Sequence, residues 1–271
     1  MKPTLKDFLD FLETIAPGRL AESWDNPGLQ VGSLSQKISK IFTSLDPTFN
    51  ALTSASEANA QLLFTHHPLI FKPLSRLDIN SFPGDVVAKA AKSGISIVAA
   101  HTNLDAAKGG INDILADLMR LRNVEVLKNA DEMDGVGLGR IGYLPEPAGL
   151  SLVARDVKKV LGTQNIKVVG KKDTLIHRLA VVGGSGGSLL SLAYEQGADL
   201  LLTGDVGHHV ALEAKSLGMA LLDGGHFHTE KTAFRVFVKN LNKILKAKGW
   251  EITFEIDKDE TDPIWIDAPV K

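Results

Sequence analysis

Residues 61–68 have the sequence QLLFTHHP, a short apolar run that ends at two histidines and a proline. A continuous apolar run of this length is typical of a strand that is buried on both faces of a parallel sheet. Residues 40–46 and 95–100 form similar runs, and predicted helices at 51–60 and 83–93 separate the three strands. Short apolar strands that alternate with helices predict an α/β fold with a mostly parallel sheet flanked by helices.

The same plan recurs in the second half of the chain. The predicted elements there are a strand at 178–182, a helix at 188–196, a strand at 200–203, a helix at 210–217 and a strand at 218–222. Thr203 follows Thr65 by 138 positions, whereas Gly218 follows Gly94 by 124, which one insertion or deletion in a connecting loop explains. We therefore expect an internal duplication of two similar α/β halves, residues 1–125 and 126–271.

The remaining segments carry weaker signals. Thr4 and Asp7 form a capping box that predicts a helix from residue 5 to 15, and residues 24–32 have the composition of turns. Two further strands and one helix are expected in the segments 135–144, 250–256 and 150–162, respectively. Pro145-Glu146-Pro147 is expected to end the strand at 135–144 and to separate it from the helix at 150–162.

Composition excludes several classes of protein. The chain has 271 residues, a net charge of −2, 44% apolar residues and no cysteine. These values indicate a folded globular protein and exclude disulfides, thiolate metal sites and a cysteine nucleophile. The N-terminus lacks the apolar core of a signal peptide and the longest uncharged stretch, 179–194, is too short to span a bilayer, so we expect a cytoplasmic protein without membrane contact. Near-neutral charge argues against a general nucleic-acid binder.

Three polar motifs follow predicted strands. They are His66-His67, then His101 with Asp105 four positions later, and His226 with Glu230 four positions later. Ligands in parallel α/β sheets bind beyond the carboxyl ends of strands, so the two halves would bring these side chains to one cleft. Without His101, the remaining five residues offer nitrogen and oxygen donors that suffice for two metal ions, a kind of site that activates water for hydrolysis.

Each motif alone also has a structural interpretation. Taken alone, His66 and His67 are explained at least as well as surface or loop histidines, and Asp105 is better explained as part of a turn or helix cap before Gly109. Glu230 would favour the positive end of a helix that runs to about residue 248. The metal hypothesis therefore depends on the three motifs occurring together.

Three glycine-containing segments each have a functional and a structural interpretation. Residues 137–142 match the dinucleotide pattern GxGxxG, but Tyr143-Leu144-Pro145 follows where a helix is required, so we reject that function. Residues 183–188 lie between a strand and a helix and are either a phosphate-binding loop or, in our preferred interpretation, a tight turn. Thr203-Gly204-Asp205 with His209 is either a helix start or a set of groups supporting the site.

These motifs together resemble the NGG-one-interacting-factor-three-like family, whose bacterial members are often called GTP cyclohydrolase 1 type 2 homologs. The resemblance covers the whole chain. It depends on Trp24-Asp25-Asn26 with Gly28-Leu29-Gln30 and Gly32, Thr65-His66-His67-Pro68, His101-Thr102-Asn103 with Asp105, Gly184, Thr203-Gly204-Asp205 with His209, and Gly225-His226 with Glu230.

The resemblance implies two α/β halves around a dinuclear metal site, and a homohexamer. The ligands carried over from the family pattern are His66, His67, Asp105, His226 and Glu230, with His101 and His209 close by. The ions would be zinc, iron or manganese. Some members have an extra domain between the halves, for which this chain is too short.

Two functions remain open at this point. The leading hypothesis is a metal-dependent hydrolase that acts on a small, nucleotide-like substrate through a metal-bridging water, with His101 transferring protons because an unligated histidine titrates near neutrality. The alternative is a non-catalytic metal-binding, metal-delivery or adaptor protein. An open coordination position and substrate turnover distinguish the two.

Overall fold

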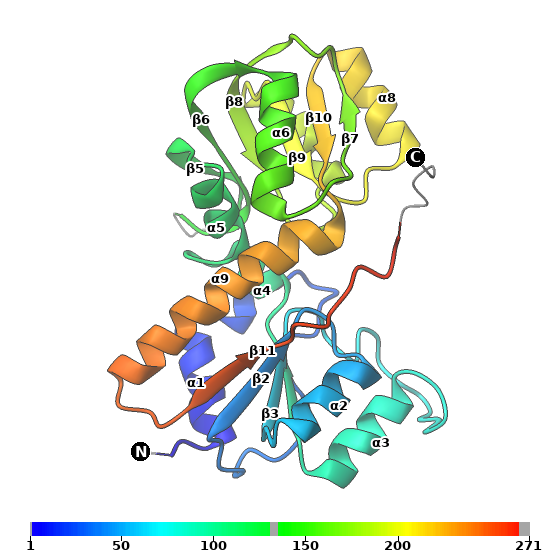
Figure 1. The fold of residues 1–271 in the computed structure, drawn as a ribbon, viewed down its shortest axis with the longest axis vertical. Helices are drawn as coiled ribbons and strands as arrows, with labels where there is room; N and C mark the ends of the chain where they lie inside the picture. The colour runs from blue at the N-terminus through cyan, green and yellow to red at the C-terminus, as the bar shows by residue number, and fades with distance from the viewer. Residues whose placement is uncertain (1, 131–134, 266–271) are drawn as a thin grey trace. The chain divides into compact units, whose positions relative to one another are not determined.

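The computed structural model describes residues 2–130 and 135–265. The chain divides into two compact units, one formed by residues 1–107 and 234–260 and the other by residues 108–233 and 261–271. Each unit contains its own sheet with helices packed on it (Figure 1). None of the described helices combines the length and the apolarity that a membrane-spanning helix requires.

The first unit contains a five-stranded sheet in the order β1-β4-β3-β2-β11. Its strands are β1 (Gly28–Val31), β2 (Lys40–Ser44), β3 (Leu62–Thr65), β4 (Ser96–Ala99) and β11 (Thr253–Ile256). The strands β11, β2, β3 and β4 run parallel, and β1 is antiparallel to β4. The three apolar runs of the first half are thus adjacent parallel strands, as the sequence predicts.

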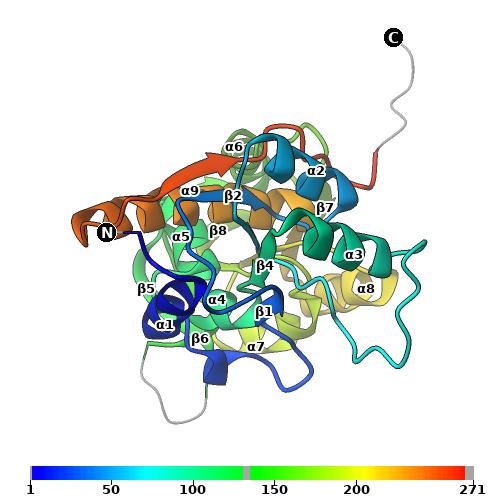
Figure 2. The ribbon, with the colours of Figure 1, turned by 90° about the horizontal axis from the view of Figure 1, so that it is seen from below.

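Both faces of this sheet are covered by helices. The helices are α1 (Leu5–Ile15), α2 (Phe49–Glu57), α3 (Gly84–Ser93), α4 (Thr102–Ala106) and the later part of α9 (His226–Ala247), with a 3-10 turn η1 (Gly18–Leu20). Figure 2 shows β2 and β4 between α1 and the pair α2 and α3.

Alternation along β3 explains this arrangement, because successive side chains of a strand point to opposite faces. Leu63 belongs to the core cluster that includes Leu52 of α2 and Val86 of α3. Its neighbour Phe64 points the other way, and its ring lies 5.6 Å from that of Phe8 in α1 and 5.5 Å from that of Phe234 in α9.

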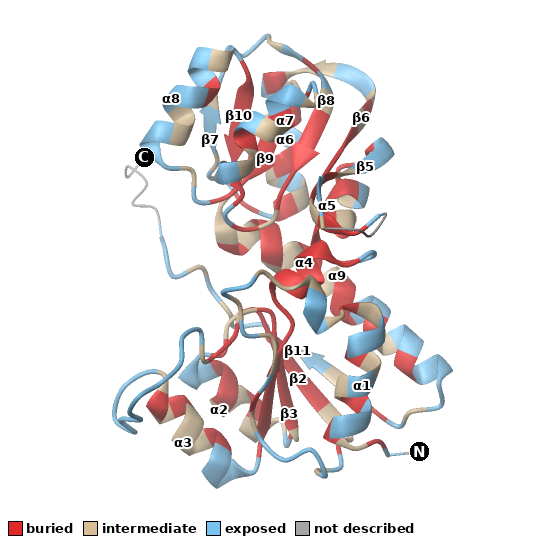
Figure 3. Ribbon diagram, turned by 180° about the vertical axis from the view of Figure 1, so that it is seen from behind, coloured by how far each residue is buried: buried red, intermediate tan, exposed pale blue. Residues whose placement is uncertain are grey.

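The second unit contains a six-stranded sheet in the order β5-β6-β8-β9-β10-β7. Its strands are β5 (Arg122–Asn129), β6 (Gly137–Gly149), β7 (Lys167–Val169), β8 (Leu175–Val181), β9 (Leu200–Thr203) and β10 (Ala220–Asp223). Its helices are α5 (Ile111–Leu118), α6 (Leu150–Leu161), α7 (Leu190–Glu195) after the 3-10 turn η2 (Gly187–Leu189), α8 (His208–Leu217) and the first part of α9. The central strands are among the most buried parts of the chain (Figure 3).

Strand order supports the internal duplication. In each sheet three parallel strands follow one another, β2-β3-β4 in the first and β8-β9-β10 in the second. An antiparallel strand pairs with the third member each time, β1 with β4 and β7 with β10. The two halves therefore share a four-stranded arrangement, and they differ in the strands added at the other edge.

Two expectations are wrong. Residues 28–31 form strand β1 rather than only a turn. Strand β6 also continues through Pro145 and Pro147 to Gly149 instead of stopping before them. Its pairing with β8 is irregular between Tyr143 and Ala148, and such a bulge tolerates prolines because the missing N–H donors are not required by the ladder.

Candidate metal centre

His66 and His67 directly follow β3 in the first unit. His66 is completely buried, and its Nδ1 donates to the carbonyl oxygen of Ala100 over 2.8 Å. Being two positions after Phe64, it faces the same side of the sheet, and its ring lies 5.8 Å from that of Phe234. The next residue, His67, donates from Nδ1 to Oδ1 of Asp46 over 2.7 Å.

His101 follows β4, which lies beside β3. Its Nδ1 donates to Oδ1 of Asp25 over 2.8 Å, and the carboxylate of Asp25 also accepts hydrogen bonds from the backbone N–H and the hydroxyl of Thr102. Burial would raise the pKa of Asp25, but the hydrogen bonds from His101 and Thr102 outweigh it and hold this pKa at about 2. Asp25 therefore stays ionised and fixes the ring of His101.

The three histidines form one cluster. One potential ligand nitrogen from each of His66, His67 and His101 lies within 4.8 Å of the other two. Each Nδ1 donates to an oxygen that only accepts, so the neutral ring carries its lone pair on Nε2. A metal-ligating histidine usually has this arrangement, with the second ring nitrogen held by a carboxylate or carbonyl.

Asp105 adds a carboxylate to this cluster. It lies in α4, is buried, and places Oδ1 3.5 Å from Nε2 of His66. Two donors bound to the same tetrahedral ion at about 2.1 Å are roughly 3.4 Å apart, so this separation fits a shared ion. His66, His67, His101 and Asp105 are thus together, as the sequence predicts for the first unit.

The second unit contains a smaller cluster at the start of α9. His226 opens this helix, and its Nδ1 donates to Oδ2 of Asp205 over 2.6 Å. Its Nε2 lies 3.0 Å from Oε2 of Glu230, one helical turn later. Glu230 is buried. Because α9 begins at His226 rather than at Glu230, both residues face the same side of a helix, and their 3.0 Å separation is that of an ion pair, somewhat shorter than the roughly 3.4 Å of two ligands of one tetrahedral ion.

Glycines allow this second cluster to pack closely. At Gly184, with φ +61°, an added Cβ would lie 2.1 Å from Oε1 of Glu230. At Gly204 an added Cβ would lie 2.5 Å from the backbone nitrogen of His226. The turn after β8 and the motif Thr203-Gly204-Asp205 therefore make room for, and orient, the two side chains of α9.

The other histidines have different surroundings. His208 and His209 are exposed at the start of α8, with their rings 5.7 Å apart. His228 has its Nε2 3.6 Å from Oδ2 of Asp262, and burial lowers its pKa. His177 is exposed beside the ring of Tyr143.

Sequence reasoning missed the role of Asp46. It follows β2 and orients His67. Asp46 could have been found by its position directly after a predicted strand, because β2 and β3 are adjacent parallel strands whose carboxyl ends lie side by side. The segment 137–142 lies within the antiparallel strand β6, in agreement with its rejection as a dinucleotide loop.

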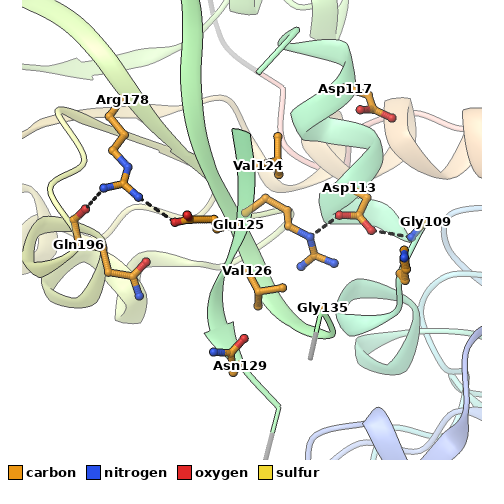
Figure 4. A pocket seen from close by; sticks show the side chains of 12 residues that line it. Gly109, Asp113, Asp117, Val124, Glu125, Val126, Asn129, Gly135, Arg178 and Gln196 are labelled. Atoms are coloured by element: carbon orange, nitrogen blue, oxygen red, sulfur yellow. Dashed lines mark hydrogen bonds and ion pairs between the residues drawn. The ribbon is translucent and has the colours of Figure 1, made fainter. Parts of the chain in front are cut away.

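A pocket of about 920 Å³ is found in the second unit, lined by residues of α5, β5 and their surroundings (Figure 4). Arg140 is 2% exposed and pairs through Nε with Oδ1 of Asp113, while Nη2 of Arg178 lies 3.0 Å from Oε2 of Glu125. Among the described residues that line this pocket there is neither His226 nor Glu230. The pocket is therefore separate from the pair His226 and Glu230 of this unit.

Comparison with known proteins identifies the family. The Duf34/NIF3 (NGG1p interacting factor 3) family matches residues 3–263. The chain belongs to this family. A relative from Clostridium perfringens, named GTP cyclohydrolase 1 type 2 homolog, is 32% identical over 96% of this chain and 98% of its own. A relative of the same name from Methanocaldococcus jannaschii is 35% identical, covering 92% of this chain and 99% of its own.

Solved structures of similar proteins have the same fold. A Bacillus cereus protein described as related to NIF3 matches with a TM-score of 0.93 and 27% identity, over 98% of this chain and all of that one. A structure described as reduced HcgD from Methanocaldococcus jannaschii matches with a TM-score of 0.79 and 31% identity, over 96% and 99% of the two chains. The α/β fold predicted from the sequence is confirmed.

Proposed function

We propose that this Duf34/NIF3 protein is a metal-dependent hydrolase whose ligands for two divalent metal ions are His66, His67, Asp105, His226 and Glu230. The observation that carries the proposal is the cluster of histidines after β3 and β4, each held at Nδ1 by an oxygen acceptor. Nitrogen and carboxylate donors suit zinc, iron or manganese. When bound, such ions supply Lewis-acid activation for hydrolysis.

His101 is proposed to move protons during the reaction. Its Nδ1–H is held by the carboxylate of Asp25, so that Nε2 is the nitrogen that would exchange the proton. The same placement beside His66 and His67 also suits a metal ligand. A His101→Ala variant distinguishes the two roles: a proton-transfer residue retains the metal and loses turnover, whereas a ligand loses both.

The substrate is proposed to be a small, nucleotide-like molecule, on the basis of the names of the relatives. The family resemblance further supports a homohexamer, which light scattering of the purified protein tests directly.

Elemental analysis of protein purified without added metal tests the site. We expect bound divalent metal in the parent protein, and a loss of most of it in His66→Ala and in Glu230→Gln. His177→Ala removes an exposed histidine outside both clusters and should leave metal content unchanged. Metal content that is unaltered in His66→Ala would refute the ligand assignment.

Turnover tests the reaction. The metal-loaded protein would be assayed against nucleotides and phosphoesters, with Glu230→Gln as the control for contaminating activity. Metal-dependent product formation that is lost in the control supports a hydrolase. Stable metal binding without any turnover would instead favour a metal-binding or metal-delivery protein.

A further inference from the structure

Two half-exposed aromatic rings lie beside His101 in the first unit. Trp24 is 54% exposed and Phe71 is 47% exposed, and their ring centroids are 5.4 Å apart. The ring of His101 lies 5.9 Å from that of Trp24 and 6.2 Å from that of Phe71. Adjacent exposed aromatic side chains mark a binding surface more often than isolated ones do, because each leaves a large apolar area in water.

Hydrogen bonds hold the residues that adjoin both rings in the chain. Asp25, next to Trp24, is held by His101 and by the backbone N–H of Thr102. Trp24 is thus the chain neighbour of the residue that orients the imidazole of His101. The exposed ring is thus attached to a buried, ionised anchor rather than to a mobile loop end.

A second network connects the segment of Trp24 to that of Phe71. The side-chain amide of Asn26 donates to the carbonyl oxygen of Ile70 over 2.7 Å, and the N–H of Ile70 donates to Oε1 of Gln30 over 3.0 Å. The side-chain amide of Gln30 in turn donates to the carbonyl oxygen of Asn26 over 2.7 Å. Both backbone groups of Ile70 are therefore held, and Phe71 is placed beside Trp24 before any ligand binds.

We propose that Trp24 and Phe71 form a stacking platform for a planar heteroaromatic ring, of the size of a nucleobase, in the substrate of the proposed hydrolase. The two rings are tilted by 40°, so neither covers the other in parallel stacking. A ring stacked on the indole lies next to His101, which brings the rest of the ligand toward the histidine cluster. Aromatic side chains bind bases through their faces in this way, with little dependence on base identity.

This inference rests on the proposed function for the identity of the ligand, but not for the existence of the platform. Guanosine 5′-monophosphate and ribose 5-phosphate are suitable probes, because they share sugar and phosphate and differ by the base. Binding would be measured by calorimetry and by tryptophan fluorescence, with metal content determined for each preparation.

We expect guanosine 5′-monophosphate to quench Trp24 fluorescence and ribose 5-phosphate neither to quench nor to compete. Trp24→Leu should weaken binding of the nucleotide by about tenfold or more, the range of one lost stacking contact. Trp24→Phe should stay within a few-fold of the parent, because it keeps an aromatic face. Trp265→Leu, which removes a tryptophan that is 79% exposed elsewhere, should bind like the parent.

Several results would overturn the platform. They are an absence of nucleotide binding in the metal-loaded parent, equal affinity in Trp24→Leu, and equal losses in Trp24→Leu and Trp24→Phe. Unchanged nucleotide affinity with an altered molecular mass in Trp24→Leu would assign the surface to contacts between copies of the chain. A protein that takes up no divalent metal but still binds the nucleotide through Trp24 would refute the proposed hydrolase and retain the platform.

Discussion

Replacing Asp25 by asparagine should destabilise the first unit in a pH-dependent way. The side chain of Asp25 is inaccessible to solvent, and its pKa is about 2 in the folded protein compared with 3.8 for an unperturbed aspartate. A difference of this size corresponds to about 2 kcal/mol of folding free energy at neutral pH. The contribution comes from hydrogen bonds that His101 and Thr102 donate to the ionised carboxylate.

The direction of the pH effect follows from the lowered pKa. Because the folded state binds a proton at Asp25 less readily than the unfolded state does, the stabilisation is fully present above about pH 4 and is lost as the pH falls toward 2. The parent protein should therefore exceed Asp25→Asn in stability by about 2 kcal/mol near pH 7, and this advantage should shrink below pH 4.

Urea denaturation followed by circular dichroism measures both the stability difference between the two proteins at pH 7 and its change with pH. The protein solution should contain a chelator, because a bound metal would add its own stabilisation to the folded state. Asp78→Asn is a matched control, because hydrogen bonds from Asn80 and Ser81 lower the pKa of an aspartate that is fully exposed, and its effect should be much smaller. A loss below about 0.5 kcal/mol in Asp25→Asn at pH 7, the size of an ordinary surface change, would refute the reasoning. A difference in unfolding free energy between the parent and Asp25→Asn that stays the same at neutral pH and at pH 3 would also refute it.

Two further changes separate local packing from metal binding. Gly184→Ala should displace Glu230 and lower metal content by elemental analysis, whereas Gly162→Ala, also at positive φ but with open space around the new Cβ, should lose only about 1 kcal/mol of stability and keep the metal. Equal metal content in the two variants would contradict a role for Gly184 in placing Glu230. Asp113→Ala should cost about 3–5 kcal/mol in urea denaturation, because it leaves the buried guanidinium of Arg140 without its carboxylate partner, and a loss under about 1 kcal/mol would contradict that account.

Much of the fold was predictable because its central strands are locally encoded. The apolar runs at 62–65 and 200–203 are buried in the middle of their sheets, so their own composition identifies them. The peripheral strands β1, β5 and β7 lack such runs, since an edge strand is stabilised mainly by the partner with which it pairs. Their positions therefore depend on β4, β6 and β10 rather than on their own sequence.

The candidate site, too, was predictable from the sequence only in part. The spacing of His226 and Glu230 predicts two ligands on one side of a helix, and the structure confirms that both lie in the first turn and a half of α9. It also confirms that His66 and His101 follow adjacent parallel strands. The assignment of five metal ligands remains a prediction that metal analysis must test.

By itself, the sequence determined which residue types follow the central strands and, through the absence of cysteine, that any metal site must use histidine and carboxylate. Only the tertiary structure decided which nitrogen of each histidine is available. The acceptors that hold Nδ1 of His66, His67 and His101 lie 34, 21 and 76 positions away in the chain. Such partners are brought together by the pairing of strands and the packing of loops on them, which local sequence patterns do not encode.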